Sequence, residues 1–185
     1  MMVEQHDFDG VLLIKPPVFE DDRGHFMVAY NKKAFNESTN IEIDFIQDNE
    51  SKSSYGTLRG LHFQTPPFAQ SKLVRVSKGE VLDVIVDLRS DSKTFGQSAS
   101  FILNDENKYQ LFIPKGFAHG FLVLSTYAIF SYKVDALYAP DHDSGILWND
   151  RAINIDWQID IETILLSEKD NNLMSFESYK ANPYF

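Results

Sequence analysis

Two histidines stand in short segments whose residue types could support proton transfer or metal binding. Residues 114–119 read Pro-Lys-Gly-Phe-Ala-His, in which Pro and Gly favour a tight turn and His119 follows on the next predicted strand. Upstream, His62 follows Gly56 after five intervening residues, and Gln64 stands two positions beyond His62. Imidazole is the usual side chain for proton transfer near neutral pH and is also a common metal ligand. These two segments therefore mark the candidate site.

The pair of spacings resembles the two motifs of the cupin jelly roll, a small β-barrel that is open at one end. Metal-binding cupins have a second histidine where this chain has Gln64, and a glutamate shortly afterwards, where it has Phe68 and Ala69. A zinc, iron or manganese ion normally needs three or more protein ligands. The chain also has no cysteine that could supply a thiolate. We therefore predict a site without a metal or any other cofactor.

Short runs that alternate apolar and polar residues, separated by turn signals, must position these side chains. In residues 81–88, Leu82, Val84 and Val86 fall on one face of a strand, together with Leu88. The other predicted strands span residues 10–15, 25–30, 45–48, 61–64, 73–76, 98–103, 109–113, 120–124 and 128–134. Predicted helices are few: residues 32–36, and either 162–166 or 168–174. The pattern predicts one all-β domain over residues 1–185, a cupin-type jelly-roll sandwich or barrel with a few short helices.

The composition excludes several classes of protein. The chain of 185 residues is 43% hydrophobic with a formal net charge of −10, which is typical of a folded domain and unlike a nucleic-acid-binding or anionic-membrane-binding protein. It begins without a basic and apolar leader and has no apolar run long enough to cross a membrane. We expect a cytoplasmic protein without nucleic-acid or membrane partners. An anionic small molecule could still bind where cations converge.

A longer series of matching segments identifies a family. The segments cover residues 19–26, 47–49, 58–64, 70–76, 79–84, 113–121, 131–133 and 145–150, and the third of them reads Leu-Arg-Gly-Leu-His-Phe-Gln. Standing in this order, they resemble the dTDP-4-dehydrorhamnose 3,5-epimerases, metal-free cupin enzymes of dTDP-L-rhamnose synthesis. The resemblance fades after Asp170, so we expect residues 171–185 to serve only as a packing segment.

The resemblance implies a set of catalytic residues. Epimerisation beside a ketone removes a proton from one face of a sugar carbon and returns one to the other face through an enolate, which requires a base, an acid and a group that stabilises the enolate oxygen. His62 matches the family's base, and Asp170 matches the aspartate that holds its imidazole. Tyr132 matches the acid. Lys72, with His119, matches the cations beside the enolate oxygen.

The resemblance also implies substrate-binding residues, for a nucleotide-sugar substrate and a homodimeric enzyme. Cations must offset the negative charge of the protein near the diphosphate, and an arginine fork suits phosphate oxygens. Positions that match family substrate contacts are Arg23, Gln47, Asp48, Asn49, Arg59, His119, Asp143 and Lys169, and Phe26 and Tyr138 could stack on the base or line the sugar pocket. Val28 departs from the family, which usually has a substrate-contacting glutamate there.

The expected reaction converts dTDP-4-dehydro-6-deoxy-D-glucose to dTDP-4-dehydro-L-rhamnose by epimerisation at carbons 3 and 5. One alternative is a relative that epimerises a single carbon or accepts another nucleotide-linked 4-keto sugar, and the region around Val28 and Asp143 would decide this. A second alternative is a sugar-binding cupin without catalysis. Because a binding module needs no acid and base together, the presence of His62, Tyr132 and Lys72 favours the enzyme.

Overall fold

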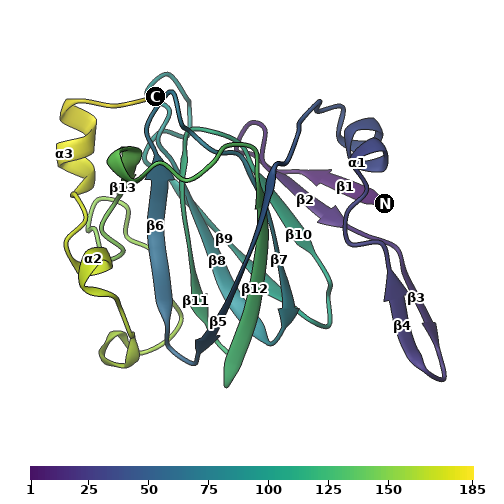
Figure 1. Cartoon of the computed structure of the whole chain (residues 1–185). Coiled ribbons are helices and arrows are strands. Elements are labelled where there is room, and N and C mark those ends of the chain that lie inside the picture. The colour runs from purple at the N-terminus through teal and green to yellow at the C-terminus, as the bar shows by residue number, and fades with distance from the viewer.

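Alternating apolar residues in the middle of the chain form strands that assemble into two facing antiparallel sheets (Figure 1). The structure is a computed structural model that describes residues 1–185. One sheet has six strands in the order β1 (Met2–Gln5), β2 (Leu12–Lys15), β10 (Gln110–Ile113), β7 (Lys72–Lys78), β12 (Tyr127–Val134) and β5 (Gln47–Ser54). The other has five, in the order β13 (Asp143–Gly145), β6 (Leu58–Gln64), β11 (Phe117–Val123), β8 (Glu80–Asp87) and β9 (Ser98–Asn104). The predicted all-β jelly-roll class is confirmed.

The core has three apolar clusters, one between the sheets and one on the outer face of each. Between the sheets, Val74 and Phe130 of the six-stranded sheet pack with Ile85 and Phe121 of the five-stranded sheet. Strand β8 is buried along almost its whole length because both of its faces are covered. Its even-numbered residues, which the alternation placed on one face, pack against the C-terminal segment rather than into the space between the sheets.

The C-terminal segment covers the outer face of the five-stranded sheet (Figure 1). It contains α2 (Glu168–Asn171) and α3 (Phe176–Ala181), and the Tyr179 hydroxyl of α3 donates a hydrogen bond to the Leu88 carbonyl at 2.8 Å. The packing role expected for residues 171–185 is confirmed. The predicted helix at 162–166 is only a 3₁₀ turn at Ile161–Thr163, whereas the alternative at 168–174 is the short α2.

Several strand boundaries differ from the prediction. Strand β5 continues to Ser54, beyond the predicted end at residue 48. It is an edge strand with little apolar surface to bury, so its sequence lacks the apolar alternation that predicts a strand. Strands β1, β3 (Val18–Asp21) and β13 are short and were not predicted, and neither was α3. Helix α1 (Lys32–Thr39) runs three residues beyond its predicted end, to Thr39, and the following residue Asn40, with a φ of 57°, ends the helix. None of the helices has the length and apolar character that a membrane span requires.

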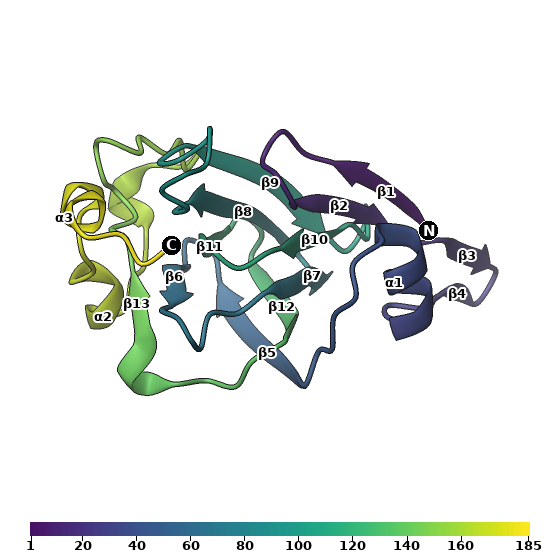
Figure 2. The same cartoon turned by 90° about the horizontal axis from the view of Figure 1, so that it is seen from above.

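Two parts of the architecture matter for function. Strands β3 and β4 (Gly24–Met27) form a separate two-stranded hairpin that projects from the body beside the N-terminus (Figure 1). Three connections cross between the sheets at one end of the sandwich: β6 to β7, β10 to β11, and β12 to β13. The first and the third are seen from above in Figure 2. Of the candidate catalytic residues, His62, Lys72 and Tyr132 lie on strands that these two connections join, whereas Asp170 lies on α2.

Candidate active site

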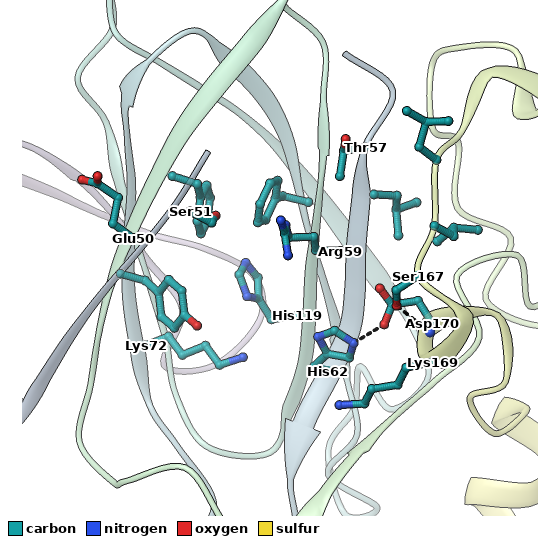
Figure 3. A pocket seen from close by; sticks show the side chains of 16 residues that line it. Glu50, Ser51, Thr57, Arg59, His62, Lys72, His119, Ser167, Lys169 and Asp170 are labelled. Atoms are coloured by element: carbon teal, nitrogen blue, oxygen red, sulfur yellow. Dashed lines mark hydrogen bonds and ion pairs between the residues drawn. The ribbon is translucent and has the colours of Figure 1, made fainter. Parts of the chain in front are cut away.

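A cavity of about 560 Å³ opens between the two sheets (Figure 3). Strands β6 and β11 of one sheet and β5, β7 and β12 of the other contribute to it, and residues 165–170 form a further wall. Among the residues predicted from sequence, it collects His62, Lys72, Tyr132, Asp170, Arg59, His119 and Lys169. Residues far apart in the sequence thus meet here because antiparallel pairing brings their strands together.

His62 and Asp170 form a hydrogen-bonded pair on the side of the five-stranded sheet. The Nε2 atom of His62 lies 2.5 Å from Oδ1 of Asp170, and the Asp170 residue is 3% exposed. Burial alone would raise the pKa of Asp170, but hydrogen bonding and charge from His62, together with a hydrogen bond from Ser167, bring its pKa below the ordinary value. An ionised Asp170 holds the His62 Nε2–H, so the basic lone pair of a neutral His62 is on Nδ1.

Ser167 fixes the aspartate from the other side. It is the N-cap of α2, and its hydroxyl accepts a hydrogen bond from the Asp170 N–H at 3.1 Å. In a usual capping box the carboxylate three residues later would reach back to the cap. Here the Asp170 carboxylate reaches His62 instead. The helix start thus presents a rigid carboxylate to the cavity.

Tyr132 and Lys72 approach from the facing sheet. They stand on the adjacent strands β12 and β7, with Val134 paired to Lys72 and Tyr132 paired to Val74. Burial lowers the pKa of Lys72 to about 8, against the opposing charges of Asp83 and Asp143. Burial raises the pKa of Tyr132, so its hydroxyl stays protonated. Figure 3 shows Lys72 and His62 entering the cavity from opposite sides.

His119 is buried beside an acidic partner. Its Nε2 lies 2.9 Å from Oδ2 of Asp83, and it is 7% exposed. Burial lowers the pKa of His119 and raises that of Asp83, while the charge of each partner opposes the shift of the other. The role of His119 as a cation beside the enolate oxygen, together with Lys72, stays a prediction.

The predicted nucleotide-binding residues are only partly brought to the cavity. Arg59 lines it and donates to the Ser53 hydroxyl at 3.0 Å. Lys169 also lines it and contacts the Asp143 carboxylate, to which the Tyr138 hydroxyl donates at 2.7 Å. Gln47, Asp48 and Asn49 are on β5, outside the cavity. The Gln47 amide donates to the Asn49 side chain at 2.7 Å, and Asp48 and Asn49 border a neighbouring hollow over β5, β7 and β12.

Arg23 and Phe26 lie outside the cavity, on the projecting β3–β4 hairpin. The Arg23 side chain is 89% exposed and pairs only with Asp21, at 2.5 Å, while Phe26 is 65% exposed. Val28 follows directly after the hairpin and is half exposed. A single copy of the chain therefore does not bring these predicted contacts to its own catalytic residues.

Some residues that line the cavity were not predicted from the sequence. Phe121 and Phe130 form a stacked pair whose ring centroids are 4.1 Å apart, and both line the cavity. Their strands were predicted, but an apolar residue on a strand gives no sign of lining a cavity. Ser167 did carry a signal, because a serine three residues before a carboxylate is a helix-start pattern. No group of three or more His, Asp or Glu side chains is arranged to hold a metal ion.

Proton-transferring groups on two facing sheets, inside a jelly-roll sandwich, suit a reaction that moves a proton from one face of a sugar carbon to the other. The fold and the cavity thus define a cupin-type epimerase, an isomerase rather than a binding module.

Comparison with known proteins supplies the family. A family model described as dTDP-4-dehydrorhamnose 3,5-epimerase matches residues 5–178, so the resemblance does not fade at Asp170 as expected but extends into α3. The Pseudomonas aeruginosa enzyme of that name is 52% identical over 173 residues, covering 94% of each chain, and the Shigella flexneri enzyme is 49% identical over 176 residues, covering 95% of this chain and 96% of its own. The chain belongs to the dTDP-4-dehydrorhamnose 3,5-epimerase family.

A solved structure agrees with this assignment. The crystal structure of the Legionella pneumophila dTDP-6-deoxy-D-glucose-3,5-epimerase, in complex with dTDP-4-keto-L-rhamnose, superposes with a TM-score of 0.93 at 42% sequence identity. The alignment covers 97% of this chain and 95% of that one. Similarity therefore extends over the whole fold, including the strands that form the cavity.

Proposed function

We propose that this enzyme converts dTDP-4-dehydro-6-deoxy-D-glucose to dTDP-4-dehydro-L-rhamnose by proton exchange at carbons 3 and 5. The observation that carries the proposal is the division of the cavity: His62 stands on the five-stranded sheet with Asp170 of α2 bonded to it, and Tyr132 and Lys72 stand on the six-stranded sheet. A sugar bound between them has a proton acceptor on one face and a proton donor on the opposite face. Inversion of a carbon requires this arrangement.

His62 begins each inversion. The unprotonated Nδ1 of its neutral imidazole removes the proton from the carbon beside the 4-keto group, and the electron pair of the broken C–H bond forms the enolate. Asp170 stabilises the imidazolium that results, because its ionised carboxylate is already hydrogen-bonded to Nε2. Tyr132 then donates its hydroxyl proton to the opposite face of the same carbon, and solvent restores both groups.

Lys72 stabilises the intermediate. Its ammonium group is buried in the cavity wall, where a charge interacts more strongly with an enolate oxygen than it would in water. The protonated lysine is held in place before the reaction, so no reorganisation is needed when negative charge develops. Preorganised charge of this kind is commonly the largest single contribution to catalysis.

Cations at the cavity bind the diphosphate of the substrate. Arg59 offers a guanidinium inside the cavity, and Lys169 lines the same cavity from α2, beside Asp143. The net charge of −10 repels an anionic substrate at long range, so these local cations are required. Gln47 and Asn49 on β5, together with Tyr138, supply hydrogen-bonding and stacking groups for the nucleoside.

A second copy of the chain completes the site. Arg23 and Phe26 match family substrate contacts but project from the body, exposed to solvent and away from the cavity of their own chain. In a two-fold dimer the hairpin of one protomer can reach the cavity of the other, which would bury Phe26 and bring Arg23 to the diphosphate. We propose a homodimer in which each active site is built from both protomers.

We further propose that the chain acts as one domain, without a cofactor, in the cytoplasm. Residues 1–185 act as a single domain, because strands from both halves of the chain interleave in each sheet. The enzyme works without a metal or cofactor, since acid, base and cation are all side chains. It acts in the cytoplasm, where a chain without cysteine has no need of an oxidising compartment.

The reaction is tested by incubating the enzyme with dTDP-4-dehydro-6-deoxy-D-glucose in deuterated water and locating deuterium in the product. We expect one deuterium at carbon 3 and one at carbon 5. Deuterium at only one carbon would assign a mono-epimerase. Tight binding of the substrate without any incorporation would assign a sugar-binding cupin and contradict the proposal.

A further inference from the structure

Two of the connections that cross between the sheets join the strands of the catalytic residues: β6 to β7, and β12 to β13 (Figure 2). The first crossing, residues 65–71, leaves β6 three residues after His62 and enters β7 at Lys72. The second crossing, residues 135–142, leaves β12 three residues after Tyr132 and enters β13, whose first residue pairs with Gln64. How these two crossings are held therefore contributes to the distance from the base to the acid and the cation.

One buried side chain is hydrogen-bonded to both crossings. The amide nitrogen of Gln64 donates to the Phe68 carbonyl at 2.7 Å in the first crossing and to the Leu137 carbonyl at 3.1 Å in the second. Its amide oxygen accepts from the Ala139 N–H at 2.7 Å. Gln64 is 4% exposed, so water cannot easily replace these bonds.

Other hydrogen bonds link the two crossings directly. The Gln70 amide donates to the Ala136 carbonyl at 2.7 Å, and the Ser71 N–H donates to the Asp135 carboxylate at 2.6 Å. The Thr65 N–H donates to the His142 carbonyl at 2.9 Å, and the Thr65 hydroxyl lies 2.8 Å from His142 Nδ1. Gln64 differs from these residues because it stands on β6 and its one side chain makes three hydrogen bonds, which reach both crossings.

We propose that Gln64 is a positioning residue, which fixes the separation between His62 on one sheet and Tyr132 and Lys72 on the other by tying the two crossings together. The proposal rests on the roles assigned to those three residues in the proposed function. Gln64 itself does not line the cavity and takes no part in proton transfer.

The proposal predicts a specific defect when the ties are removed. Gln64→Met keeps the length of the side chain but makes none of the three hydrogen bonds. His62 and Asp170 should still remove the proton, because neither is hydrogen-bonded to Gln64. Tyr132 on the other sheet should deliver its proton less well, so the imidazolium, after exchange with deuterated water, more often returns a deuteron to the original face.

The experiment measures two rates in deuterated water: deuterium entry into unconverted substrate, and formation of epimerised product. We expect the ratio of exchange to epimerisation to rise roughly tenfold in Gln64→Met, because displacements near 1 Å commonly cost that much or more. Gln70→Met should raise the ratio less. Tyr132→Phe is the positive control, and its ratio should rise further.

Ser125→Ala is the matched control, because it removes side-chain hydrogen bonds that hold a turn far from the catalytic residues. The Ser125 hydroxyl accepts from the Glu80 N–H at 2.8 Å and donates to the Tyr127 carbonyl at 2.7 Å, in a turn that does not line the cavity. Its exchange-to-epimerisation ratio should match that of the parent, whatever happens to its melting temperature.

An unchanged ratio in Gln64→Met would overturn the proposal, whether activity is retained or falls in parallel with stability. If Gln64→Met does not fold, Gln70→Met decides by the same criterion. Failure of the proposed function is distinguishable, because the parent would then neither exchange nor epimerise.

Discussion

The cavity and the β3–β4 hairpin both carry predicted site residues, but they are built in opposite ways. His62, Lys72 and Tyr132 stand on strands buried within the sandwich, with side chains fixed by pairing and packing on both sides. Arg23 stands in the turn and Phe26 on one strand of a hairpin whose two short strands pair only with each other, and both side chains are exposed. In the proposed dimer, one chain supplies the rigid frame for the chemistry, and a second copy supplies part of the substrate binding.

The largest effect is expected from removing the base. His62→Ala should lower kcat by about 10²- to 10⁴-fold, the usual contribution of a positioned proton-transfer group, and should abolish deuterium exchange at both carbons. Tyr132→Phe should also lower kcat but leave some exchange, because His62 can still remove the proton. The measurement is proton NMR of substrate and product in deuterated water. Exchange in His62→Ala near the parent rate would mean that the base lies elsewhere.

Lys72 should set the alkaline limit of the pH dependence of kcat. With a pKa lowered to about 8 by burial, Lys72 is a cation below that pH and becomes a neutral amine as pH rises through it. Because only the cation stabilises the enolate well, kcat should fall as pH rises above about 8. Lys72→Met should lower kcat by about 10²- to 10³-fold and remove this limb from the pH profile. An alkaline limb that persists in Lys72→Met would assign it to another group.

The hairpin should affect binding more than chemistry. Arg23→Ala should raise KM by roughly 10- to 100-fold with little change in kcat, since a hydrogen bond to a charged group contributes about 1.5 to 3 kcal/mol. Arg59→Ala, inside the cavity, offers the comparison. Steady-state kinetics with the dTDP-linked substrate measure both. A KM for Arg23→Ala equal to that of the parent would remove the hairpin from the site.

Val28 tests whether the hairpin region also sets selectivity. The family usually has glutamate at this position, and valine can accept no hydrogen bond from the nucleotide or sugar. We expect Val28→Glu to raise the preference in kcat/KM for dTDP- over UDP-linked 4-keto-6-deoxy sugars by about tenfold. A strong dTDP preference in the parent that Val28→Glu leaves unchanged would show that the substitution has no effect on selectivity.

Metal removal should have the smallest effect. Dialysis against a chelator is expected to leave kcat unchanged, because His62 and His119 are hydrogen-bonded to Asp170 and Asp83 and the catalytic groups are side chains. Activity that is lost on dialysis and restored by one added metal ion would contradict this.

The same contrast explains what could be predicted from the sequence. The β class followed from alternation, which is strong where one face of a strand is buried, as at Leu82 and Val84. Alternation failed for β5, whose polar residues line an edge, and for β13, which has three residues and takes its place from β6. The family resemblance singled out His62 and Asp170, which the structure shows hydrogen-bonded to each other, but no local pattern shows that Arg23 lies outside its own cavity.

The surroundings of two buried residues, His119 and Gln64, could not be predicted from the sequence either. The sequence suggested a cationic His119, and only the structure shows it enclosed with Asp83. Gln64 looked like a lost metal ligand, whereas it holds two connections that no sequence pattern brings together. Both cases depend on neighbours far away in the chain.

The shared site is tested most directly by a hybrid dimer. One protomer carries His62→Ala, and the other carries Arg23→Ala with Phe26→Ala, so that neither homodimer is fully active. The two chains are expressed together with different tags and purified through both. If each hairpin serves the cavity of its partner, one of the two sites in the hybrid is intact, and we predict about half of the parent's kcat/KM per dimer, measured with substrate well below the parent's KM. A kcat/KM no higher than the residual level of the two homodimers would contradict the account.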